Sequence, residues 1–399
     1  MTGPRTKLPV LYLTHRVPYP PDKGDRIRNY HLLRQLAASR KVWLACLADE
    51  PVLAESLEAV NQFCERVAVL HLQRLRRWVK AGLSLMQGGS LSEGLFHHAG
   101  LRRIIREWTR QTQFQAVVVS ASSLVPYLRQ EGLEKIPAVV DLVDVDSQKW
   151  LDFARVSPPP RRWVYRLEAR RVRQIEIGLP TWAQAVSVVS QAEADIYHAL
   201  VGADAAIVAT NGVDLDYYRP IRNAPQRVCV FVGAMDYWPN VDGVVWFARE
   251  LWPTIRAKCP DAVFRIVGRK PTRVIQQLAS LPGIEVTGAV PDVRPFVASA
   301  AVVVVPLRLA RGIQNKVLEA LAMGKAVVAT PPALAGLSTI PGRDLLSAVT
   351  PTEWVEVVCG LLNDPERCHV LGTAGRRFVE QNHHWERCLE PLVKTITNL

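Results

Sequence analysis

The sequence lacks the features of a disulfide-rich, zinc-binding or membrane-spanning protein. Its seven cysteines are scattered among 399 residues, and no two form a Cys-x-x-Cys pair. An odd number of isolated cysteines argues against a disulfide framework and a zinc site, and favours a reducing compartment. The longest apolar run, at 300–306, is far shorter than the roughly 20 residues that span a bilayer. No signal-peptide core is evident near the start, so we expect a cytoplasmic protein.

Acidic residues are scarce relative to basic ones. The chain has 49 Lys and Arg against 37 Asp and Glu, a formal net charge of +12. Much of the excess falls in 66–110 and 161–173, where aromatic residues interleave with arginines. Such segments suit an anionic partner, either a nucleoside diphosphate or an anionic lipid, but solvated helix faces give the same composition. No recognition motif for nucleic acid is present, so we expect no nucleic-acid partner.

Length and periodicity predict two α/β domains. With 49% hydrophobic and 22% charged residues the composition is that of a globular protein, and 399 residues exceed one typical core. Short β-branched runs alternate with helical patterns in two sets, separated by the turn-rich residues 209–225. The runs are continuously apolar, as in parallel sheets covered on both faces. We therefore predict two Rossmann-like, doubly wound parallel-sheet domains, with strands near 10–14, 42–45, 68–72, 116–120, 138–142 and 185–189, then 229–233, 263–267, 284–287, 301–305 and 326–329.

The loop after the first predicted strand carries the first candidate site. In parallel sheets ligands bind beyond the carboxyl ends of strands, and this loop leads into a helix. Gly24 lets the backbone approach a ligand closely, and the helix N-terminus favours anions. We expect Gly24, Asp25 and Arg26 to contact a substrate. The alternative is a proline-stiffened loop with solvated charges.

Three acids lie at the end of the strand predicted at 138–142. Asp144 and Asp146, with Asp141 before them, lie where side chains meet ligands, so they are candidates to polarise a hydroxyl group or accept its proton. One of them would otherwise cap the next helix. Two carboxylates alone are a weak metal signal, and we expect no metal.

The most informative stretch is 306–329, where a glycine opens the start of a helix after a strand. Gly312, Ile313, Gln314 and Asn315 would present backbone N–H groups that lack partners inside the helix, and a diphosphate satisfies them together with the helix dipole. Lys316 would add a full positive charge. Glu319, one turn later on the same face, would accept hydrogen bonds from a ribose diol. The alternative is a surface ion pair, worth less than about 1 kcal/mol.

Weaker candidates follow other strands of the second half. Gly233 ends the strand predicted at 229–233, Arg269 follows the strand predicted at 263–267, and Arg308 and Arg311 precede the helix predicted after Gly312. Any of these arginines would reach a diphosphate from the side, although solvated arginines are common.

Together these residues resemble the retaining GT-B glycosyltransferases of family 4. More narrowly, the chain is similar to sugar transferases encoded with exosortase and exopolysaccharide systems in bacteria. The resemblance covers nearly the whole chain and is carried by Lys23-Gly-Asp-Arg26 with Asn29, Asp144-Val-Asp-Ser147, Ser187-Val-Val-Ser190, Asn211-Gly-Val-Asp214, Phe231-Val-Gly-Ala-Met-Asp-Tyr-Trp-Pro-Asn240, Val286-Thr-Gly-Ala-Val-Pro-Asp292 and Gly312-Ile-Gln-Asn-Lys-Val-Leu-Glu319.

The resemblance implies an acceptor domain at 1–208, a donor domain at 209–378 and a final segment, 379–399, that returns to the first domain. It implies sugar transfer from a nucleoside-diphosphate sugar to a glycan or lipid-linked acceptor with retention, in exopolysaccharide or cell-surface glycan synthesis. No cofactor or metal is implied. Because lipid-linked acceptors reside at membranes, we also expect the basic N-terminal segments of a cytoplasmic protein to make peripheral contact with the inner face of an anionic membrane.

The sequence departs from the family pattern at two places. The first glutamate of the usual Glu-x7-Glu signature would fall at Arg311, and Gly233 is followed by Ala-Met-Asp instead of the usual basic phosphate clamp. Arg269, Arg308 or Arg311 would replace that clamp. Two alternatives therefore stay open: an inactive nucleotide-sugar or polysaccharide-binding protein, and a nucleotide-sugar epimerase of the same fold.

Overall fold

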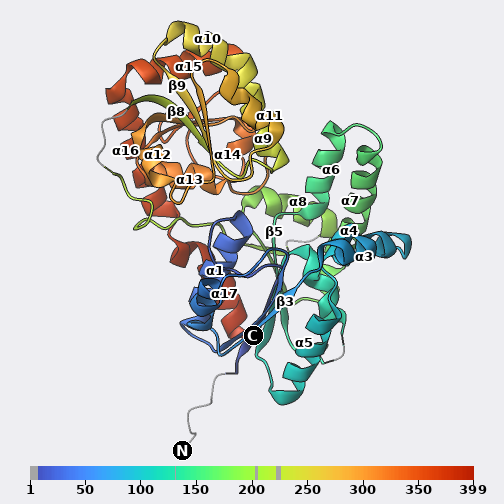
Figure 1. The fold of residues 1–399 in the computed structure, drawn as a ribbon. Helices are drawn as coiled ribbons and strands as arrows, with labels where there is room; N and C mark the ends of the chain where they lie inside the picture. Colours follow the sequence, from blue (N-terminus) through green and yellow to red (C-terminus); the bar gives the residue numbers. More distant parts are fainter. Residues whose placement is uncertain (1–7, 131, 203–204, 222–225) are drawn as a thin grey trace, which may run out of the picture. The chain divides into compact units, whose positions relative to one another are not determined.

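A computed structural model describes residues 8–130, 132–202, 205–221 and 226–399, and the chain divides into two compact units (Figure 1). The first unit ends at Ala209 and is completed by Leu389–Leu399, and the second is Thr210–Cys388. The sequence predicts boundaries at 208/209 and 378/379. Residues 379–388 therefore belong to the second unit, although the sequence assigned them to the first.

Hydrogen bonds explain why the chain returns to the first unit later than expected. The N–H of Val213 donates to the carbonyl of His383 at 2.8 Å, and the His383 ring nitrogen Nδ1 lies 2.8 Å from the carbonyl oxygen of Asn211. A Cβ on Gly212 would lie 2.6 Å from the backbone nitrogen of Trp385. These contacts fasten residues 383–385 to the start of the second unit.

The first unit contains a seven-stranded parallel sheet in the order β3-β2-β1-β4-β5-β6-β7, with helices on both faces (Figure 1). Its strands are β1 (Val10–Thr14), β2 (Val42–Ala48), β3 (Arg66–His71), β4 (Ala116–Ser120), β5 (Ala138–Val143), β6 (Ala185–Val188) and β7 (Ala206–Val208). Its helices are α1 (Gly24–Ala37), α2 (Ala54–Asn61), α3 (Arg74–Met86), α4 (Leu91–Leu95), α5 (Ala99–Gln111), η1 (Ser122–Arg129), α6 (Asp146–Val156), α7 (Arg161–Gly178), η2 (Leu179–Thr181) and α8 (Gln191–Val201). The last helix, α17 (Trp385–Asn398), begins in the second unit and ends in the first.

The second unit contains a six-stranded sheet in the order β10-β9-β8-β11-β12-β13, whose strand pairs are all parallel. Its strands are β8 (Gln226–Val232), β9 (Val263–Val267), β10 (Ile284–Gly288), β11 (Ala300–Val305), β12 (Ala326–Ala329) and β13 (Leu346–Ser347). Its helices are α9 (Trp238–Trp246), η3 (Phe247–Leu251), α10 (Trp252–Lys258), α11 (Arg273–Gln277), η4 (Leu278–Ser280), α12 (Arg294–Ser299), α13 (Asn315–Ala322), α14 (Pro331–Leu334), α15 (Pro351–Asn363) and α16 (Pro365–Asn382).

The two parallel sheets confirm the predicted fold class. Every residue of β1, β2, β4 and β11 is buried, which is why these strands read as continuous apolar runs and not as alternating patterns. Strands β7 and β13 are not among the predicted strands, because they are short strands at the edges of their sheets. In the described ranges, no helix is long and apolar enough to cross a membrane.

A buried ion pair ties α1 to the middle of the first sheet. The Arg28 guanidinium donates to both carboxylate oxygens of Asp141, at 2.7 and 2.9 Å, and both side chains are fully buried. The Ser187 hydroxyl also donates to Asp141, at 2.7 Å. Burial opposes the charge on Arg28, but Asp141 outweighs this effect and raises the arginine pKa. Asp141, which lies within β5, therefore has a structural role.

We expect Asp141→Asn to lower the free energy of unfolding by about 3–5 kcal/mol, because it leaves the Arg28 charge buried without a counter-ion. Urea unfolding followed by circular dichroism measures the loss. The matched control is Lys41→Ala, which breaks an ion pair with Glu65 whose side chains are 65% and 39% exposed; it should cost less than about 1 kcal/mol. Equal losses in the two variants would contradict this role for Asp141.

Candidate functional site

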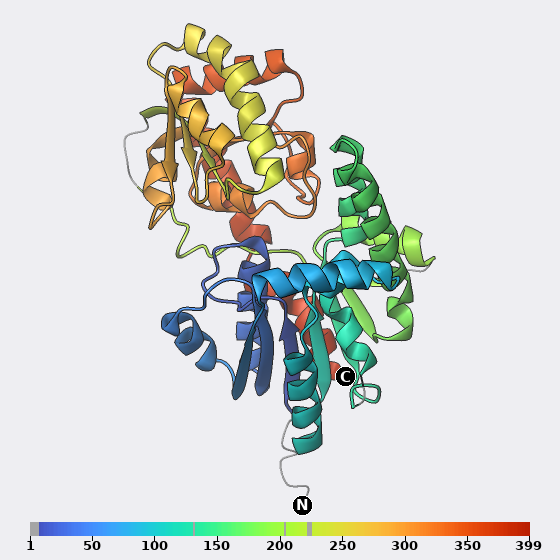
Figure 2. The ribbon, with the colours of Figure 1, turned by 45° about the vertical axis from the view of Figure 1, so that its right-hand side comes forward.

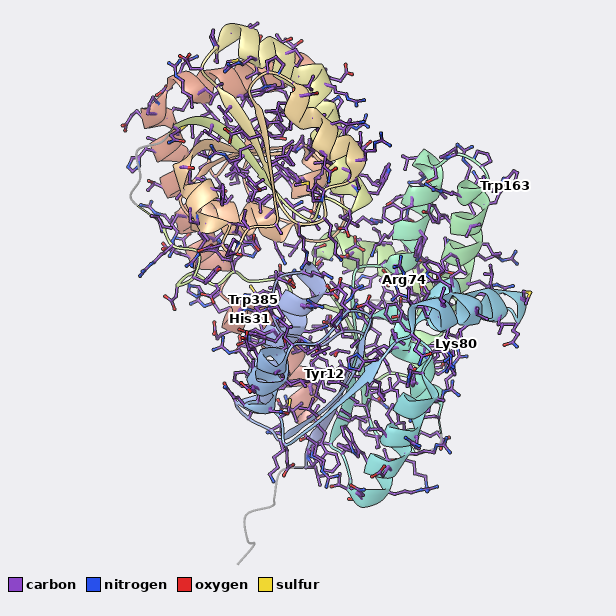
Figure 3. The ribbon with its side chains drawn as sticks, viewed as in Figure 1. Tyr12, His31, Arg74, Lys80, Trp163 and Trp385 are labelled. Carbon is purple, nitrogen blue, oxygen red and sulfur yellow. The ribbon has the colours of Figure 1, made fainter. Side chains whose placement is uncertain are left out.

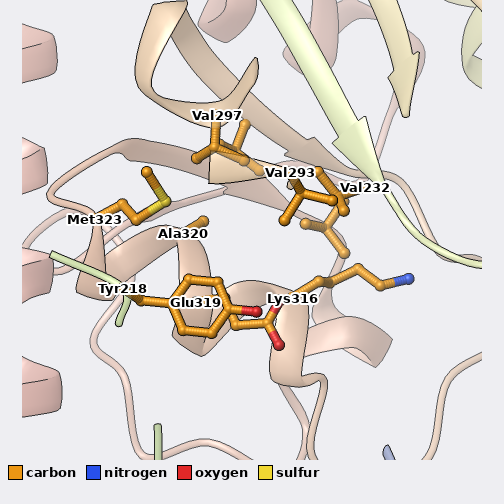
Figure 4. Close-up of a pocket in the computed structure, with 10 residues that line it drawn as sticks. Tyr218, Val232, Val293, Val297, Lys316, Glu319, Ala320 and Met323 are labelled. Carbon is orange, nitrogen blue, oxygen red and sulfur yellow. The ribbon is translucent and has the colours of Figure 1, made fainter. Parts of the chain in front are cut away.

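A small pocket at the start of α13 contains both charged residues predicted to bind a nucleotide (Figure 4). Lys316 and Glu319 lie one turn apart on α13 and both line it. The rest of the lining is Tyr218 and a largely aliphatic wall from neighbouring elements of the second unit, made of Val232, Val293, Val297, Val303, Val305, Ala320 and Met323. The two ionisable side chains, Lys316 and Glu319, therefore lie in a mostly apolar environment.

The ammonium group of Lys316 is held in place by Asn240. Lys316 Nζ donates to Asn240 Oδ1 at 2.6 Å and lies 4.6 Å from the centre of the Phe231 ring. Asn240, in the first turn of α9 and 4% exposed, also donates from Nδ2 to the carbonyl of Ala234 at 2.9 Å. Burial lowers the pKa of Lys316 to about 7, against the opposing effect of Glu319. The amine is therefore only partly protonated near neutral pH.

The carboxyl group of Glu319 has a different partner, the hydroxyl of Tyr218. Burial raises the pKa of Glu319 to about 7, while Lys316 and the Tyr218 hydrogen bond oppose that rise. Burial in turn raises the pKa of Tyr218, so its hydroxyl keeps its proton and is the donor. Since Lys316 and Glu319 each bond to another side chain, they do not form the exposed ion pair that was the alternative interpretation.

The segment before α13 makes the tight turn expected of Gly312. Gly312 has a φ of +58°, in the left-handed region that favours glycine, and a Cβ on the neighbouring Gly336 would lie 2.5 Å from its carbonyl oxygen. The helix begins at Asn315, three residues after Gly312, and the side chain of its N-cap residue, Gln314, makes no capping hydrogen bond. Gln314 instead donates from Nε2 to the carbonyl of Arg311 at 2.9 Å.

Gly233 and Gly268 bring the loops after β8 and β9 into direct backbone contact. The Gly233 N–H donates to the Val267 carbonyl at 3.0 Å, and Met235 N–H donates to the Arg269 carbonyl at 2.9 Å. A Cβ on Gly268 would lie 1.7 Å from the Gly233 oxygen, so only glycine fits there. Because β9, β8 and β11 are parallel neighbours, these loops and the one before α13 lie at the same carboxyl edge of the sheet.

The three arginines expected to contact phosphate differ in their surroundings. Arg308 donates from Nε to Asp242 at 2.9 Å and contacts the same carboxylate through Nη2, so its charge is already paired. Arg269 and Arg311 are half-buried, in the loops after β9 and β11. The sequence did not indicate the Asp242 partner, which comes from α9.

In the first unit, the charges at the start of α1 form an ion-pair network. Asp25 contacts His15 at 3.0 Å and Arg16 at 2.9 Å, and these partners outweigh burial and hold the pKa of Asp25 well below its usual range. Arg26 contacts Asp22 at 3.1 Å and Glu50 at 3.2 Å. Charged residues that we expected to meet a substrate or solvent are therefore largely neutralised by one another.

Arg26 also lines a second cavity, between the loops that follow β1 and β2. Its wall includes the Tyr19 ring and the Asp49 and Glu50 carboxylates, whereas Gly24 and Asp25 are not part of the lining. Of the three residues expected at 24–26, only Arg26 therefore faces this hollow.

The two acids after β5 lie on a strained turn. Val143 has a φ of +68°, and the Asp144 N–H donates to the Leu142 carbonyl at 2.9 Å, which makes a three-residue turn. A β-branched residue in this region costs about 1–3 kcal/mol. Asp146, the first residue of α6, accepts from the Ser122 hydroxyl at 2.6 Å. Over the described ranges, no group of three His, Cys, Asp or Glu side chains is placed to hold a metal ion.

Sequence reasoning missed Asn240, Tyr218 and Glu176. Asn240 was recognisable only as part of a motif after a strand, and Tyr218 meets Glu319 only through the fold. Glu176, on α7, accepts the Ser147 N–H at 3.0 Å beneath the start of α6, and its second carboxyl oxygen has no hydrogen-bond partner among the described residues. Burial raises the pKa of Glu176 to about 8, with a further contribution from Asp146.

The raised pKa of Glu176 predicts a pH-dependent stability. Between pH 4.5 and 8 the folded protein keeps a proton that the unfolded chain releases, so this residue makes the fold less stable as pH rises. Glu176→Gln should remove that effect. We expect the variant to gain about 1–3 kcal/mol relative to the original protein between pH 5.5 and 8, measured from melting curves at both values. A difference that stays constant with pH would contradict a protonated Glu176.

Part of the second unit is similar to a known protein family. Residues 226–364 match the family model described as Glycosyl transferases group 1, and this segment contains Gly233, Lys316 and Glu319. No curated protein matches the sequence.

Solved structures match over nearly the whole chain. Sucrose-phosphate synthase from Thermosynechococcus elongatus has a TM-score of 0.74 at 16% identity, covering 98% of this chain and 99% of that protein. Anabaena Alr3699/HepE, in complex with UDP and glucose, has a TM-score of 0.70 at 14% identity, covering 98% and 100%. The α,α-trehalose-phosphate synthase (UDP-forming) from Burkholderia vietnamiensis has a TM-score of 0.62 at 12% identity, covering 98% and 100%. At these identities the likeness shows the fold, and the chain has the predicted GT-B architecture of two parallel-sheet domains.

Proposed function

We propose that this protein is a glycosyltransferase that takes a sugar from a nucleoside-diphosphate sugar. The observation that supports this most is that Lys316 and Glu319 both line one pocket of the second unit. Both residues lie within the segment that matches the group 1 family. Anabaena HepE, a protein of similar fold, binds UDP, so a uridine nucleotide is the first ligand to test.

The donor nucleotide would bind along the first turn of α13. Its diphosphate would accept hydrogen bonds from the backbone N–H groups after Gly312, where the helix dipole and the Lys316 ammonium favour negative charge. The ribose diol would donate to Glu319, sharing that carboxylate with Tyr218 or displacing it. Positive potential placed where the diphosphate departs stabilises the leaving group without a metal ion.

The transfer itself would retain the anomeric configuration. The bond between the anomeric carbon and the phosphate oxygen breaks, and an acceptor hydroxyl attacks the same face of the sugar. The acceptor proton passes to the departing phosphate oxygen. Arg311, Arg269 and Arg308 are the candidates for contacts around the transferred sugar and phosphate, with Arg308 needing to leave Asp242 to take part.

The first unit would bind the acceptor. Arg26 and Tyr19 line its cavity, and Asp144 and Asp146 lie at the carboxyl edge of the same sheet, so these residues are candidates for contacts with sugar hydroxyls. We propose a glycan or lipid-linked acceptor, in cell-surface or exopolysaccharide synthesis on the cytoplasmic side of a membrane.

One observation favours a second function. Arg311 stands where related enzymes carry an acid, so an inactive protein that binds a nucleotide sugar is the competing interpretation. Calorimetry with a panel of nucleotide sugars, followed by assays of transfer and donor hydrolysis, separates the two. Binding with neither reaction would favour the inactive protein.

We expect Glu319→Ala to reduce donor turnover at least tenfold, because the ribose loses its hydrogen-bond acceptor. Release of nucleoside diphosphate measures turnover, with the donor chosen by thermal-shift screening. Glu356→Ala, at an exposed position on α15, is the matched control and should leave turnover unchanged. If Glu319→Ala turns over normally while retaining the original melting temperature, the proposed nucleotide site is wrong.

We also expect UDP binding at pH 8 to take up protons from solution. At that pH Glu319 is mostly ionised and Lys316 mostly neutral, and a bound diphosphate would raise the pKa of the amine. Titration calorimetry in two buffers of different ionisation enthalpy measures the uptake, and affinity should fall as pH rises from 7 to 9. Lys316→Met should abolish the uptake; the same uptake in both proteins would contradict the role of Lys316.

A further inference from the structure

The outer face of α3 is apolar and exposed to solvent. Leu75, Trp78, Val79, Leu83 and Met86 have 83%, 57%, 64%, 45% and 78% of their surface accessible. Their spacing places them on one side of the helix, which runs across one side of the first unit (Figure 2). Folded proteins rarely expose so many large apolar side chains together unless the patch contacts a partner.

The opposite face of α3 is fixed to the protein, so the exposed face is not a frayed end. Ala81 is fully buried under α4, where a Cβ on Gly94 would lie 2.5 Å from the Ala81 Cα. Lys80 Nζ donates to the His97 carbonyl at 3.1 Å, and Arg77 lies 3.5 Å from Asp49. The fold therefore holds the apolar face outward.

A buried carboxylate connects α4, on which α3 packs, to α7. Glu168 of α7 accepts the N–H groups of Leu91 and Ser92 at 2.5 and 2.8 Å, which caps α4 at its N-terminus. Trp163, at the start of α7, is 63% exposed and carries a second apolar surface in this unit (Figure 3). These helices form one supported assembly, and α3 is not an isolated segment.

The charge beside the apolar face has one sign. Residues 66–92 contain five Lys or Arg and no Asp or Glu. Arg74 and Arg76 are exposed on α3, and the helical spacing places them on the two sides of the apolar side chains. A surface that is apolar along its centre and cationic at its edges complements a layer of lipid with anionic headgroups.

We propose that α3 docks the protein on the surface of an anionic phospholipid bilayer. The apolar stripe Leu75–Met86 enters the boundary between headgroups and acyl chains, and the flanking arginines contact lipid phosphates. A single convex helix with cations at both edges fits a fluid planar surface better than it fits a protein groove. The docking would bring a lipid-linked acceptor to the first unit; only this purpose rests on the proposed function, since docking needs neither donor nor acceptor.

Vesicle flotation with the full chain tests the proposal. The vesicles are phosphatidylcholine alone or a mixture with phosphatidylglycerol, at low and high salt. We expect the original protein to float with the anionic vesicles, and to do so less at high salt. Leu75→Ser/Trp78→Ser/Val79→Ser should reduce the bound fraction at least tenfold, and Arg74→Glu/Arg76→Glu should reduce it on anionic vesicles at low salt.

The matched control carries three serines on the second unit. Ile340→Ser/Val349→Ser/Val370→Ser changes side chains that are 49%, 64% and 58% exposed, and its flotation should equal that of the original protein. Melting temperatures confirm that every variant folds, and Trp78→Ala alone provides a milder test if the triple variant unfolds.

Three results would overturn the proposal. The original protein could fail to bind anionic vesicles, or the α3 variants could bind as well as the control. The α3 substitutions could instead convert a dimer to a monomer in a protein that never binds vesicles, which would make the face a protein interface. Loss of flotation with unchanged sugar transfer to a soluble acceptor would leave the proposed function intact and support the docking role.

Discussion

The candidate site depends on two ionisable groups held one turn apart in a mostly apolar pocket at the start of α13. Burial disfavours the charge on Lys316 and also the charge on Glu319, which moves both pKa values to about 7. Lys316 bonds to Asn240 and Glu319 bonds to Tyr218, and both groups retain capacity for further hydrogen bonds. A ligand with a dianionic end could accept a hydrogen bond from Lys316, and its pair of hydroxyl groups could donate to Glu319. A nucleoside diphosphate has both features.

The parallel sheet of the second unit makes this arrangement possible. Its strands end at one edge, where the loops after β8, β9 and β11 meet, and Gly233 and Gly268 allow two of these backbones to touch. Asn240 then joins the loop after β8 to Lys316 on α13. The position of the lysine is thus set by residues from three segments, so its geometry depends on the whole unit and not on α13 alone.

Much of the fold was predictable because buried parallel strands leave a strong apolar signal. The placement of Gly312, Lys316 and Glu319 at a turn from a strand into a helix was predictable because a glycine, a base and an acid follow a strand at helical spacing, whereas their binding of a nucleotide stays a prediction. Contacts between residues that are distant in the sequence could not be predicted. Nothing near Arg308 in the sequence indicates its pairing with Asp242, and nothing near Asp25 indicates that His15 and Arg16 neutralise it. The return of the chain at 389 and not 379 likewise depends on hydrogen bonds between residues 383 and 211–213, which are distant in sequence.

The central claim is that a nucleoside diphosphate binds at the first turn of α13. Hydrogen–deuterium exchange with and without UDP measures this directly, because bound phosphate would protect the backbone N–H groups there. The account predicts slower exchange in peptides that cover 312–319 and 233–240. UDP binding that protects other segments and leaves 312–319 unchanged would contradict it.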